Sequence, residues 1–232
     1  MKNLLFVLCL ITAFNIKAQT TAIPDANFEQ ELINLGYDIA PINGSVLTSN
    51  ISGVISLDVD NKNISDLTGI EDFTALISLD CDDNLLTSLD VTQNTALFRL
   101  SCYNNQLTSL DVTQNTALES LVCSNIQLTS LDVTQNTALT HLWCTYNQLT
   151  SLNVTQNTAL TYLNCYVNQL TSLNVTQNTA LTSLYCYSNL LTSLNVTQNT
   201  ALIRLYYDLN LLTSLKVTQN TALTELGCSS NQ

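Results

Sequence analysis

The sequence predicts a β-rich solenoid, in which the chain coils through many similar turns. A unit of 21 residues repeats from Leu76 to the end of the 232-residue chain. A short fixed period of this kind is typical of a solenoid, because each unit buries its apolar face against its neighbours. Within each unit, apolar and polar residues alternate over two short segments, which indicates strands with one buried face. We therefore expect two short parallel strands per turn, forming two parallel sheets.

The first 18 residues have the features of a secretory signal peptide. Lys2 precedes an apolar run from Leu4 to Phe14, and the small residue Ala18 comes just before Gln19. This run is too short to cross a bilayer, and later apolar stretches are interrupted at the repeat spacing, so we expect no membrane-spanning segment. The sequence therefore predicts a secreted or cell-surface protein whose mature chain starts at Gln19.

Residues 19–53 are predicted to form an N-terminal cap. Pro24 and Asp25 are typical of a helix start, and Gly36 is placed to end it, which predicts a short helix over about residues 24–35. Its apolar residues recur at helical spacing, as Phe28, Leu32 and Leu35 show. The first core layer of a solenoid needs a cover, and this helix can supply it.

The repeat array follows the cap. Residues 54–75 form one transitional unit of 22 residues, and residues 76–232 contain seven full 21-residue units and one partial unit. Because the chain stops at Gln232 in the middle of a unit, we expect it to be a piece of a longer protein.

Asparagines replace glycine and proline at the turns, because neither of those residues occurs between Leu76 and Leu226. One unit reads Leu97-x-x-Leu100-x-Cys102-x-x-Asn105, followed by a similar half that ends at Asn115. Asparagine tolerates left-handed backbone geometry, and stacked asparagines can form hydrogen-bonded ladders. We expect both at these columns, with a local irregularity at Ile126, where the first column is interrupted.

The repeated pattern Leu-x-x-Leu-x-Cys-x-x-Asn-x-Leu resembles the leucine-rich repeat. The nested 21-residue form with Leu-Thr-Ser-Leu-Asp-Val-Thr-Gln-Asn is similar to the bacterial subclass called IRREKO, and residues 54–232 carry the resemblance. The start of the cap is similar to secreted leucine-rich repeat proteins of Bacteroidetes, and residues 63–70 also resemble internalin repeats. This resemblance implies a solenoid that recognises other molecules.

Most of the eight cysteines stand 21 residues apart in the third apolar place of the unit, and Tyr207 interrupts the series. Side chains stacked in register point the same way, which is poor geometry for a disulfide. A metal site lacks the usual paired Cys-x-x-Cys or histidine partners. We therefore favour buried free thiols over disulfides or a metal site.

The charge balance narrows the class of partner. The chain has a net charge of −12, and without Lys2 and Lys17 the balance becomes 4 − 18 = −14. Such a surface repels phosphate, which argues against nucleic acid or anionic lipid as partner. The first repeats carry an acidic cluster that calcium could occupy, although a solvated patch is the commoner outcome; its members are Asp58, Asp60, Asp80 and Asp82.

Comparison of the copies divides the outward positions into a constant and a variable side. The second half of each unit keeps Ser, Asp or Asn, and Thr, whereas the first half varies widely and holds most of the aromatic residues. Tyrosine, tryptophan and arginine dominate interface hot spots. The predicted ligand-binding residues are Arg99, Tyr103, His141, Trp143, Tyr162, Tyr166, Tyr185, Tyr187, Arg204 and Tyr206.

These observations predict an exported recognition or adhesion module that binds a protein ligand through the variable side. A glycan ligand on the same side is the alternative, because aromatic rings stack on sugars. A structural or ice-binding solenoid that uses the constant Ser/Asn/Thr side is a minor alternative. We expect neither an enzyme nor a cofactor, since His141 is the one histidine and no catalytic partner is placed near it.

Overall fold

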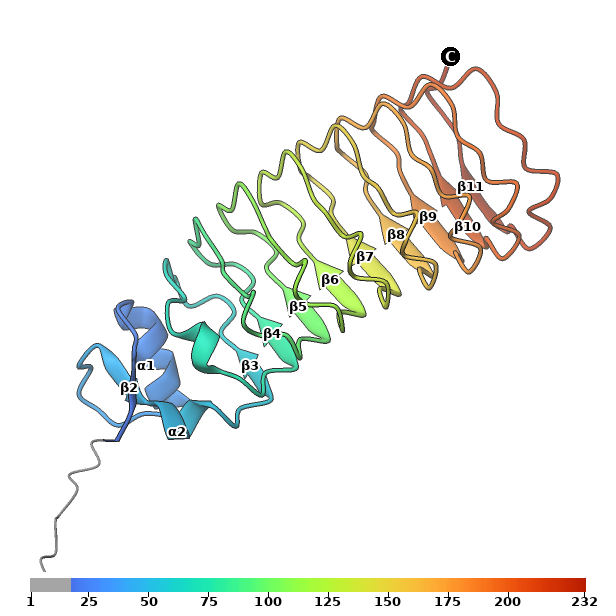
Figure 1. The fold of residues 1–232 in the computed structure, drawn as a ribbon. Coiled ribbons are helices and arrows are strands. Elements are labelled where there is room, and N and C mark those ends of the chain that lie inside the picture. The colour runs from blue at the N-terminus through green and yellow to red at the C-terminus, as the bar shows by residue number, and fades with distance from the viewer. Residues whose placement is uncertain (1–17) are drawn as a thin grey trace, which may run out of the picture.

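The computed structural model describes residues 18–232, so the predicted signal peptide lies almost entirely outside the described residues. The described chain forms an elongated coil with a cap at its N-terminal end (Figure 1). No helix in this part of the chain is long and apolar enough to cross a membrane.

One parallel sheet of nine strands runs along one side of the coil, with its strands in sequence order. Each strand has three residues, and the middle one is a leucine that points into the core in all strands but the last. The strands are β3 (Ser56–Asp58), β4 (Ser78–Asp80), β5 (Arg99–Ser101), β6 (Ser120–Val122), β7 (His141–Trp143), β8 (Tyr162–Asn164), β9 (Ser183–Tyr185), β10 (Arg204–Tyr206) and β11 (Glu225–Gly227). The parallel solenoid predicted from the repeat is confirmed.

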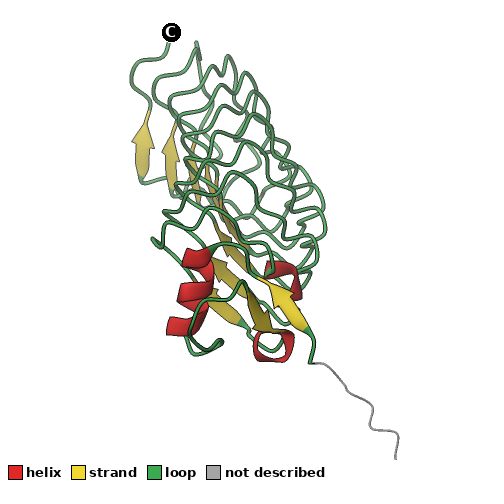
Figure 2. Cartoon of the chain, turned by 90° about the vertical axis from the view of Figure 1, so that its left-hand side faces the viewer, coloured by secondary structure: helices red, strands yellow, loops and turns green. Residues whose placement is uncertain are grey.

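The second sheet predicted from the sequence does not form in residues 18–232. The second halves of the units are turns and loops (Figure 2). They contain one isolated bridge, between Asp90 and Asp111. Local hydrogen bonds explain the difference. In the unit shown above, Asp111 Oδ1 accepts the backbone N–H of Thr113 at 2.9 Å and its hydroxyl at 2.7 Å. The side chain thus takes the N–H that a sheet ladder needs.

The left-handed residues of the turns lie one position before the predicted asparagine column. Asn104 has φ 53°, and the same position has positive φ in the following units even where it is Tyr146, Val167 or Leu209. The prediction that the column asparagines themselves adopt this geometry was therefore wrong. These asparagines instead bind the main chain, which lets other residue types occupy the left-handed position.

The column asparagines form ladders with carbonyl groups rather than with one another. Asn105 is buried, its Nδ2 donates to Cys81 O at 3.0 Å and Cys102 O at 3.1 Å, and its Oδ1 accepts from Leu86 N at 3.0 Å. In the second column, Asn115 Nδ2 donates to two carbonyls of the preceding turn. Each amide therefore joins neighbouring turns by satisfying main-chain groups that would otherwise be buried without partners.

The irregularity predicted at Ile126 is present. Ile126 is fully buried, and Gln127 right after it has φ 63°, in addition to Asn125 at 57°. Asn147 in the next turn accepts from Leu128 N at 2.9 Å. An apolar side chain cannot bind the carbonyls of the turn, so the backbone adjusts at Gln127.

The cap contains the predicted helix and elements that the sequence pattern did not reveal. Helix α1 (Ala26–Asn34) lies within the predicted range, and strands β1 (Thr20–Ala22) and β2 (Ser45–Leu47) pair antiparallel. The short helix α2 (Thr48–Ile51) follows in the cap, and the 3-10 helix η1 (Ile70–Asp72) lies in the transitional unit.

Asp25 links the cap to the first repeat. Its Oδ1 accepts from Asn27 N and Phe28 N at the start of α1, and its Oδ2 accepts from Ser65 N at 2.8 Å and Ser65 Oγ at 2.7 Å. Phe28 stacks on Phe73 of the transitional repeat at 6.3 Å between ring centroids. The helix therefore covers the first core layer, as predicted.

Six cysteines of the repeat series form a buried column of free thiols, as predicted; they are Cys81, Cys102, Cys123, Cys144, Cys165 and Cys186. Burial raises the pKa of Cys123 and of Cys165 to about 12. Cys228 differs, because it is exposed in the last described turn. Tyr207 replaces the cysteine in one turn and packs partly buried against the core.

Candidate binding face

A row of stacked rings crosses four neighbouring strands on the variable side of the sheet. We call it the first aromatic row, and it consists of His141, Trp143, Tyr162, Tyr185 and Tyr206. Trp143 and Tyr162 have centroids 4.9 Å apart, Tyr162 and Tyr185 are 5.5 Å apart, and Tyr185 and Tyr206 are 5.2 Å apart with an interplanar angle of 8°. Such stacking fixes ring orientation and leaves ring surface half exposed to solvent.

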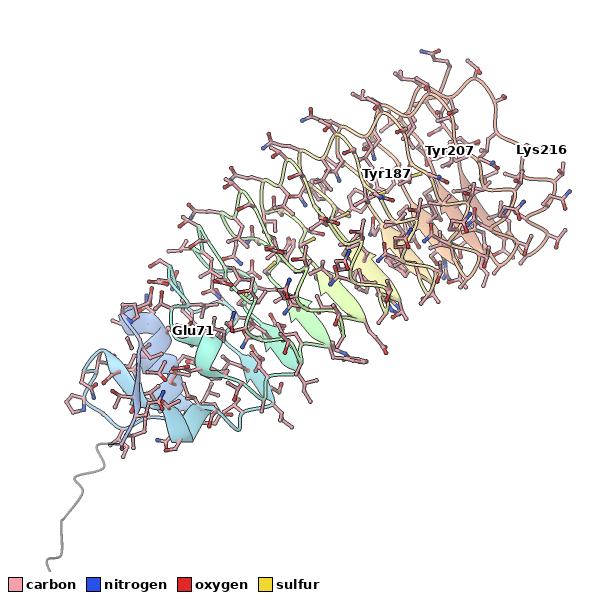
Figure 3. The ribbon with its side chains drawn as sticks, in the orientation of Figure 1. Glu71, Tyr187, Tyr207 and Lys216 are labelled. Carbon is pink, nitrogen blue, oxygen red and sulfur yellow. The ribbon has the colours of Figure 1, made fainter. Side chains whose placement is uncertain are left out.

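A second aromatic row lies beside the first, just after the strands. It consists of Tyr146, Tyr166 and Tyr187. The rings of Tyr166 and Tyr187 stack at 4.3 Å with an interplanar angle of 9°, and Tyr146 meets Tyr166 edge-on at 5.2 Å. Burial is the main cause that raises the pKa of Tyr187 to about 12. Tyr187 belongs to one of the last turns, as does Tyr207 (Figure 3).

The two rows therefore bring together seven of the ten predicted binding residues. Tyr146 was missed in the sequence comparison. It occupies the left-handed turn position after the strand and so lies outside the outward strand positions that were compared.

Of the three remaining predicted residues, two lie outside both aromatic rows and the third forms a salt bridge. Arg99 is on β5, two strands before His141, with its guanidinium carbon 6.0 Å from the centroid of Phe98. Tyr103 follows β5 and is 39% exposed. Arg204 Nε binds Glu225 Oε1 at 3.0 Å.

Glu225 was not predicted, but it organises the C-terminal end of the first row. Besides pairing with Arg204, its Oε2 accepts the hydroxyl of Tyr206 at 3.1 Å. This hydrogen bond is the main cause that raises the pKa of Tyr206. The sequence signal for Glu225 is its register position opposite Arg204 on the next strand.

A cavity of about 320 Å³ opens beside the N-terminal end of the first row. Ser120 on β6 stands in register between Arg99 and His141, and its small side chain leaves room between them. The lining residues are Phe98, Arg99, Glu119, Ser120, Thr140, His141 and Trp143. The cavity therefore combines charged groups of both signs with aromatic walls.

Asn164 is the polar exception in the first row. By register it stands between Trp143 on β7 and Tyr185 on β9. The residue is 8% exposed, and its buried Oδ1 has no hydrogen-bond partner in the described chain. Its Nδ2 lies 3.5 Å from Tyr162 Oη, the outer limit for a hydrogen bond. A buried amide oxygen without a partner costs about 1–3 kcal/mol.

His141 has the surroundings of a contact residue. Its ring stacks on Trp143 at 5.5 Å and on Tyr162 at 6.0 Å, and its Nδ1 lies 2.9 Å from Thr140 Oγ1. No carboxylate takes part in these contacts. This arrangement holds the imidazole as one more ring of the row rather than as a base oriented by an acid.

The acidic cluster does not converge into a cation site in the described part of the chain, where no group of three or more potential ligand residues is placed to hold a metal. Asp58 and Asp80 are in register on β3 and β4. Asp82 is turned toward the protein, since its Oδ1 accepts from Ser101 Oγ at 2.7 Å and Tyr103 N at 2.6 Å. The predicted calcium site therefore finds no support here.

Comparisons with known proteins agree with the fold. No family model matches the chain. A solved functional domain of InlJ from Listeria monocytogenes, described as including a cysteine ladder, is 43% identical, has a TM-score of 0.88, and is matched over 94% of this chain and 49% of its own. Internalin C2 from the same species has a TM-score of 0.80 at 21% identity over 93% of this chain and 99% of its own, which shows the fold alone.

A sequence match to Internalin J of Listeria monocytogenes is 44% identical over 71 residues, which are 31% of this chain and 8% of that protein. The chain thus spans about half of the solved InlJ domain and a small part of Internalin J. It is an internalin-like leucine-rich repeat solenoid with a buried cysteine column.

Proposed function

We propose that the chain is an exported, non-enzymatic recognition module that binds a protein ligand through its two aromatic rows. The proposal rests on the observation that residue types differ between the repeats mainly on one side of the solenoid. The constant side holds Asp or Asn and Thr because those residues build the turns, as Asp111 and Thr113 show. On the variable side the ring bonds, such as that from Tyr206 Oη to Glu225 Oε2, join side chains and do not build the turns, so the fold does not require aromatics there.

The shape of the rows also favours a macromolecular ligand. Ring contacts run from His141 on β7 to Tyr206 on β10, and strands lie about 4.8 Å apart, so the first row extends over roughly 15 Å. Stacked, half-exposed tyrosines offer a large contact area with little loss of side-chain entropy on binding. Export rests on the N-terminal sequence, with its basic residue, apolar run and small residue before Gln19.

The constant side is a poor candidate for ordering water. The threonine hydroxyls of six units donate to the Asp or Asn two residues earlier, as at Thr155 and Asn153 at 2.7 Å. These donors are therefore used within the turn. This threonine column therefore supplies no free hydroxyl donors for ordering water, which counts against the minor alternative of an ice-binding solenoid.

The experiment is capture of proteins from the surfaces of host or neighbouring cells, followed by competition among variants. Trp143→Ala and Tyr185→Ala should each weaken capture at least tenfold, since central aromatic residues dominate interface energies. Gln114→Ala and Gln135→Ala, exposed on the constant side, are the matched controls and should bind as the unchanged chain does.

A glycan array with the same four variants separates the glycan alternative from the protein ligand. Capture that survives removal of glycans from the target surface supports a protein ligand. Unchanged capture by the Trp143 and Tyr185 variants would show that the ligand binds elsewhere.

A further inference from the structure

The amide of Asn164 is buried at a position where the fold does not require a polar residue. The same position in the other turns is Asp58, Asp80, Ser101, Val122, Trp143, Tyr185, Tyr206 or Gly227, so the solenoid accepts many side chains there. The asparagines of the second column, such as Asn115, also have buried oxygens without partners, but their Nδ2 groups each bind two carbonyls and join the turns. The side-chain amide of Asn164, in contrast, makes no hydrogen bond to a neighbouring turn among the described residues.

The side chain of Tyr162 reaches this amide, with its Oη 3.5 Å from Asn164 Nδ2. Tyr162 and Asn164 lie on the same face of β8, two residues apart, and the ring of Tyr162 is 4.9 Å from that of Trp143 and 5.5 Å from that of Tyr185. Trp143 and Tyr185 are also the register neighbours of Asn164. The phenol ring therefore occupies the space between these two walls, above the amide.

The walls define a slot for one flat group. Trp143 and Tyr185 are two strands apart, so their backbones are separated by roughly 10 Å. One ring fits between two others at van der Waals distance in that space, and Tyr162 shows that it does. The bond from Asn164 Nδ2 to Tyr162 Oη is stretched to 3.5 Å, so little polar contact holds the ring in place.

Exchanging the Asn164 amide nitrogen and oxygen would still leave one buried amide atom without a hydrogen-bond partner. Tyr162 Oη could then donate to the oxygen at 3.5 Å, but the nitrogen would take the position without a partner. In either orientation one buried amide atom is unpaired. The slot therefore has aromatic walls and a floor with unused hydrogen-bonding capacity.

We propose that Asn164 is a specificity-determining residue, whose amide oxygen accepts a hydrogen bond from an aromatic side chain of the protein ligand after that ring displaces Tyr162. The inserted residue is a tryptophan or tyrosine, because these combine a large flat ring with an N–H or O–H donor, whereas the imidazole of histidine has a donor but offers the walls a smaller ring. A phenylalanine fills the slot but leaves the amide unpaired. This inference rests on the proposed function and names the chemistry that the same face selects.

The test uses two small probes with the full chain, N-acetyl-tryptophanamide and its 1-methylindole derivative, which lacks the N–H donor. Dissociation constants are measured by NMR titration. Tyr162→Ala opens the slot, so it should bind the N–H probe about tenfold more tightly than the unchanged chain does. Gln114→Ala, exposed on the constant side, is the control and should bind the probe as the unchanged chain does.

Asn164→Leu in the Tyr162→Ala background should weaken binding of the N–H probe about tenfold and leave binding of the methylated probe unchanged. Equal binding of the two probes by Tyr162→Ala would overturn the proposal. So would Asn164-dependent binding of a methyl glycoside without binding of the indole, which would assign the slot to a sugar. If Tyr162→Ala fails to fold, the ratio of the two probes is measured in the unchanged chain and in Asn164→Leu, and equal ratios reject the proposal.

The two proposals fail in different ways. Protein capture that is unaffected by Trp143→Ala and Tyr185→Ala removes the proposed function, whatever the probes do. Capture that depends on those rings, together with probes that bind alike with and without the donor, removes only the role of Asn164.

Discussion

Thr113 donates both its backbone N–H and its hydroxyl to a single oxygen of Asp111, at 2.9 and 2.7 Å. The same pair of bonds recurs in six consecutive units, with Asp90, Asp111 and Asp132 in the first three and asparagine in the next three. This turn replaces the second sheet. The residue types of the constant side therefore recur because they build this turn.

Asp111→Ala should lower the free energy of unfolding by about 1 kcal/mol, because Thr113 loses its acceptor. Asp111→Asn should be nearly neutral at pH 7, since Asn153 forms the same turn. Urea unfolding of both variants checks the difference. Equal loss in the two variants would contradict a role for the shared acceptor.

The same turn predicts an acid dependence. The hydroxyl of Thr113 is the main cause that lowers the pKa of Asp111. A carboxyl whose pKa is lower in the folded chain stabilises it above its unfolded pKa of about 3.9, and that stability is lost as the pH falls through the folded value. The triple variant Asp90→Asn, Asp111→Asn, Asp132→Asn should therefore lose less stability than the unchanged chain between pH 4 and pH 2, a range of about two units around these values.

Lys216 occupies the acceptor position of the turn in the last full unit and is exposed (Figure 3). An ammonium group cannot accept from Thr218, so this turn lacks the bonds of the earlier ones. Lys216→Asn should raise the free energy of unfolding by about 0.5–1 kcal/mol. Lys216→Gln is the control, because its longer side chain does not match the turn, and an equal gain there would point to charge alone.

Val167 is a β-branched residue in left-handed geometry, with φ 52°. Left-handed backbone costs a residue with a Cβ atom about 1–2 kcal/mol, less for asparagine. Val167→Asn should therefore stabilise the chain by about 1 kcal/mol in thermal or urea unfolding. Val167→Ile keeps the branched Cβ and should change little. Destabilisation by the asparagine would show that Val167 contributes packing that outweighs the strain.

Asp82 should make the chain less stable as the pH rises toward neutrality. Burial is the main cause that raises its pKa to about 6, although Ser101 Oγ and Tyr103 N donate to it. Because the folded pKa exceeds the unfolded value of about 3.9, the stabilisation is complete below that value and is lost as the pH rises through about 6. Asp82→Asn should flatten this part of the stability curve. An NMR titration midpoint for Asp82 below its unfolded value would reverse the prediction.

The cysteine column predicts a two-phase thiol reaction. Burial raises the pKa of Cys144 well above its usual range, and the other buried thiols behave alike, whereas Cys228 is exposed. With a thiol reagent at pH 8, the six buried cysteines should react only on unfolding. Cys228→Ser should remove one equivalent from the fast phase and leave the slow phase unchanged. A fast phase that keeps its size would place Cys228 among the buried thiols.

The 21-residue period by itself determined the parallel solenoid, the buried leucines and cysteines, and the side on which the copies vary. These features follow from which residues recur, because a repeated unit can bury its apolar positions only against its neighbours. The helical cap was also predictable, since Asp25 and the spacing after it are local signals. The binding role of the variable side remains a proposal.

The tertiary structure alone decided where the hydrogen bonds go. Alternation predicts a strand in both halves of the unit, but only coordinates show that Asp111 captures the N–H of Thr113 and that the asparagine columns bind carbonyls of the preceding turn. It also decided that Tyr162 lies over Asn164, between Trp143 and Tyr185. The direction in which a ring leans depends on the space left by side chains from neighbouring turns, and no single unit of the sequence contains that information.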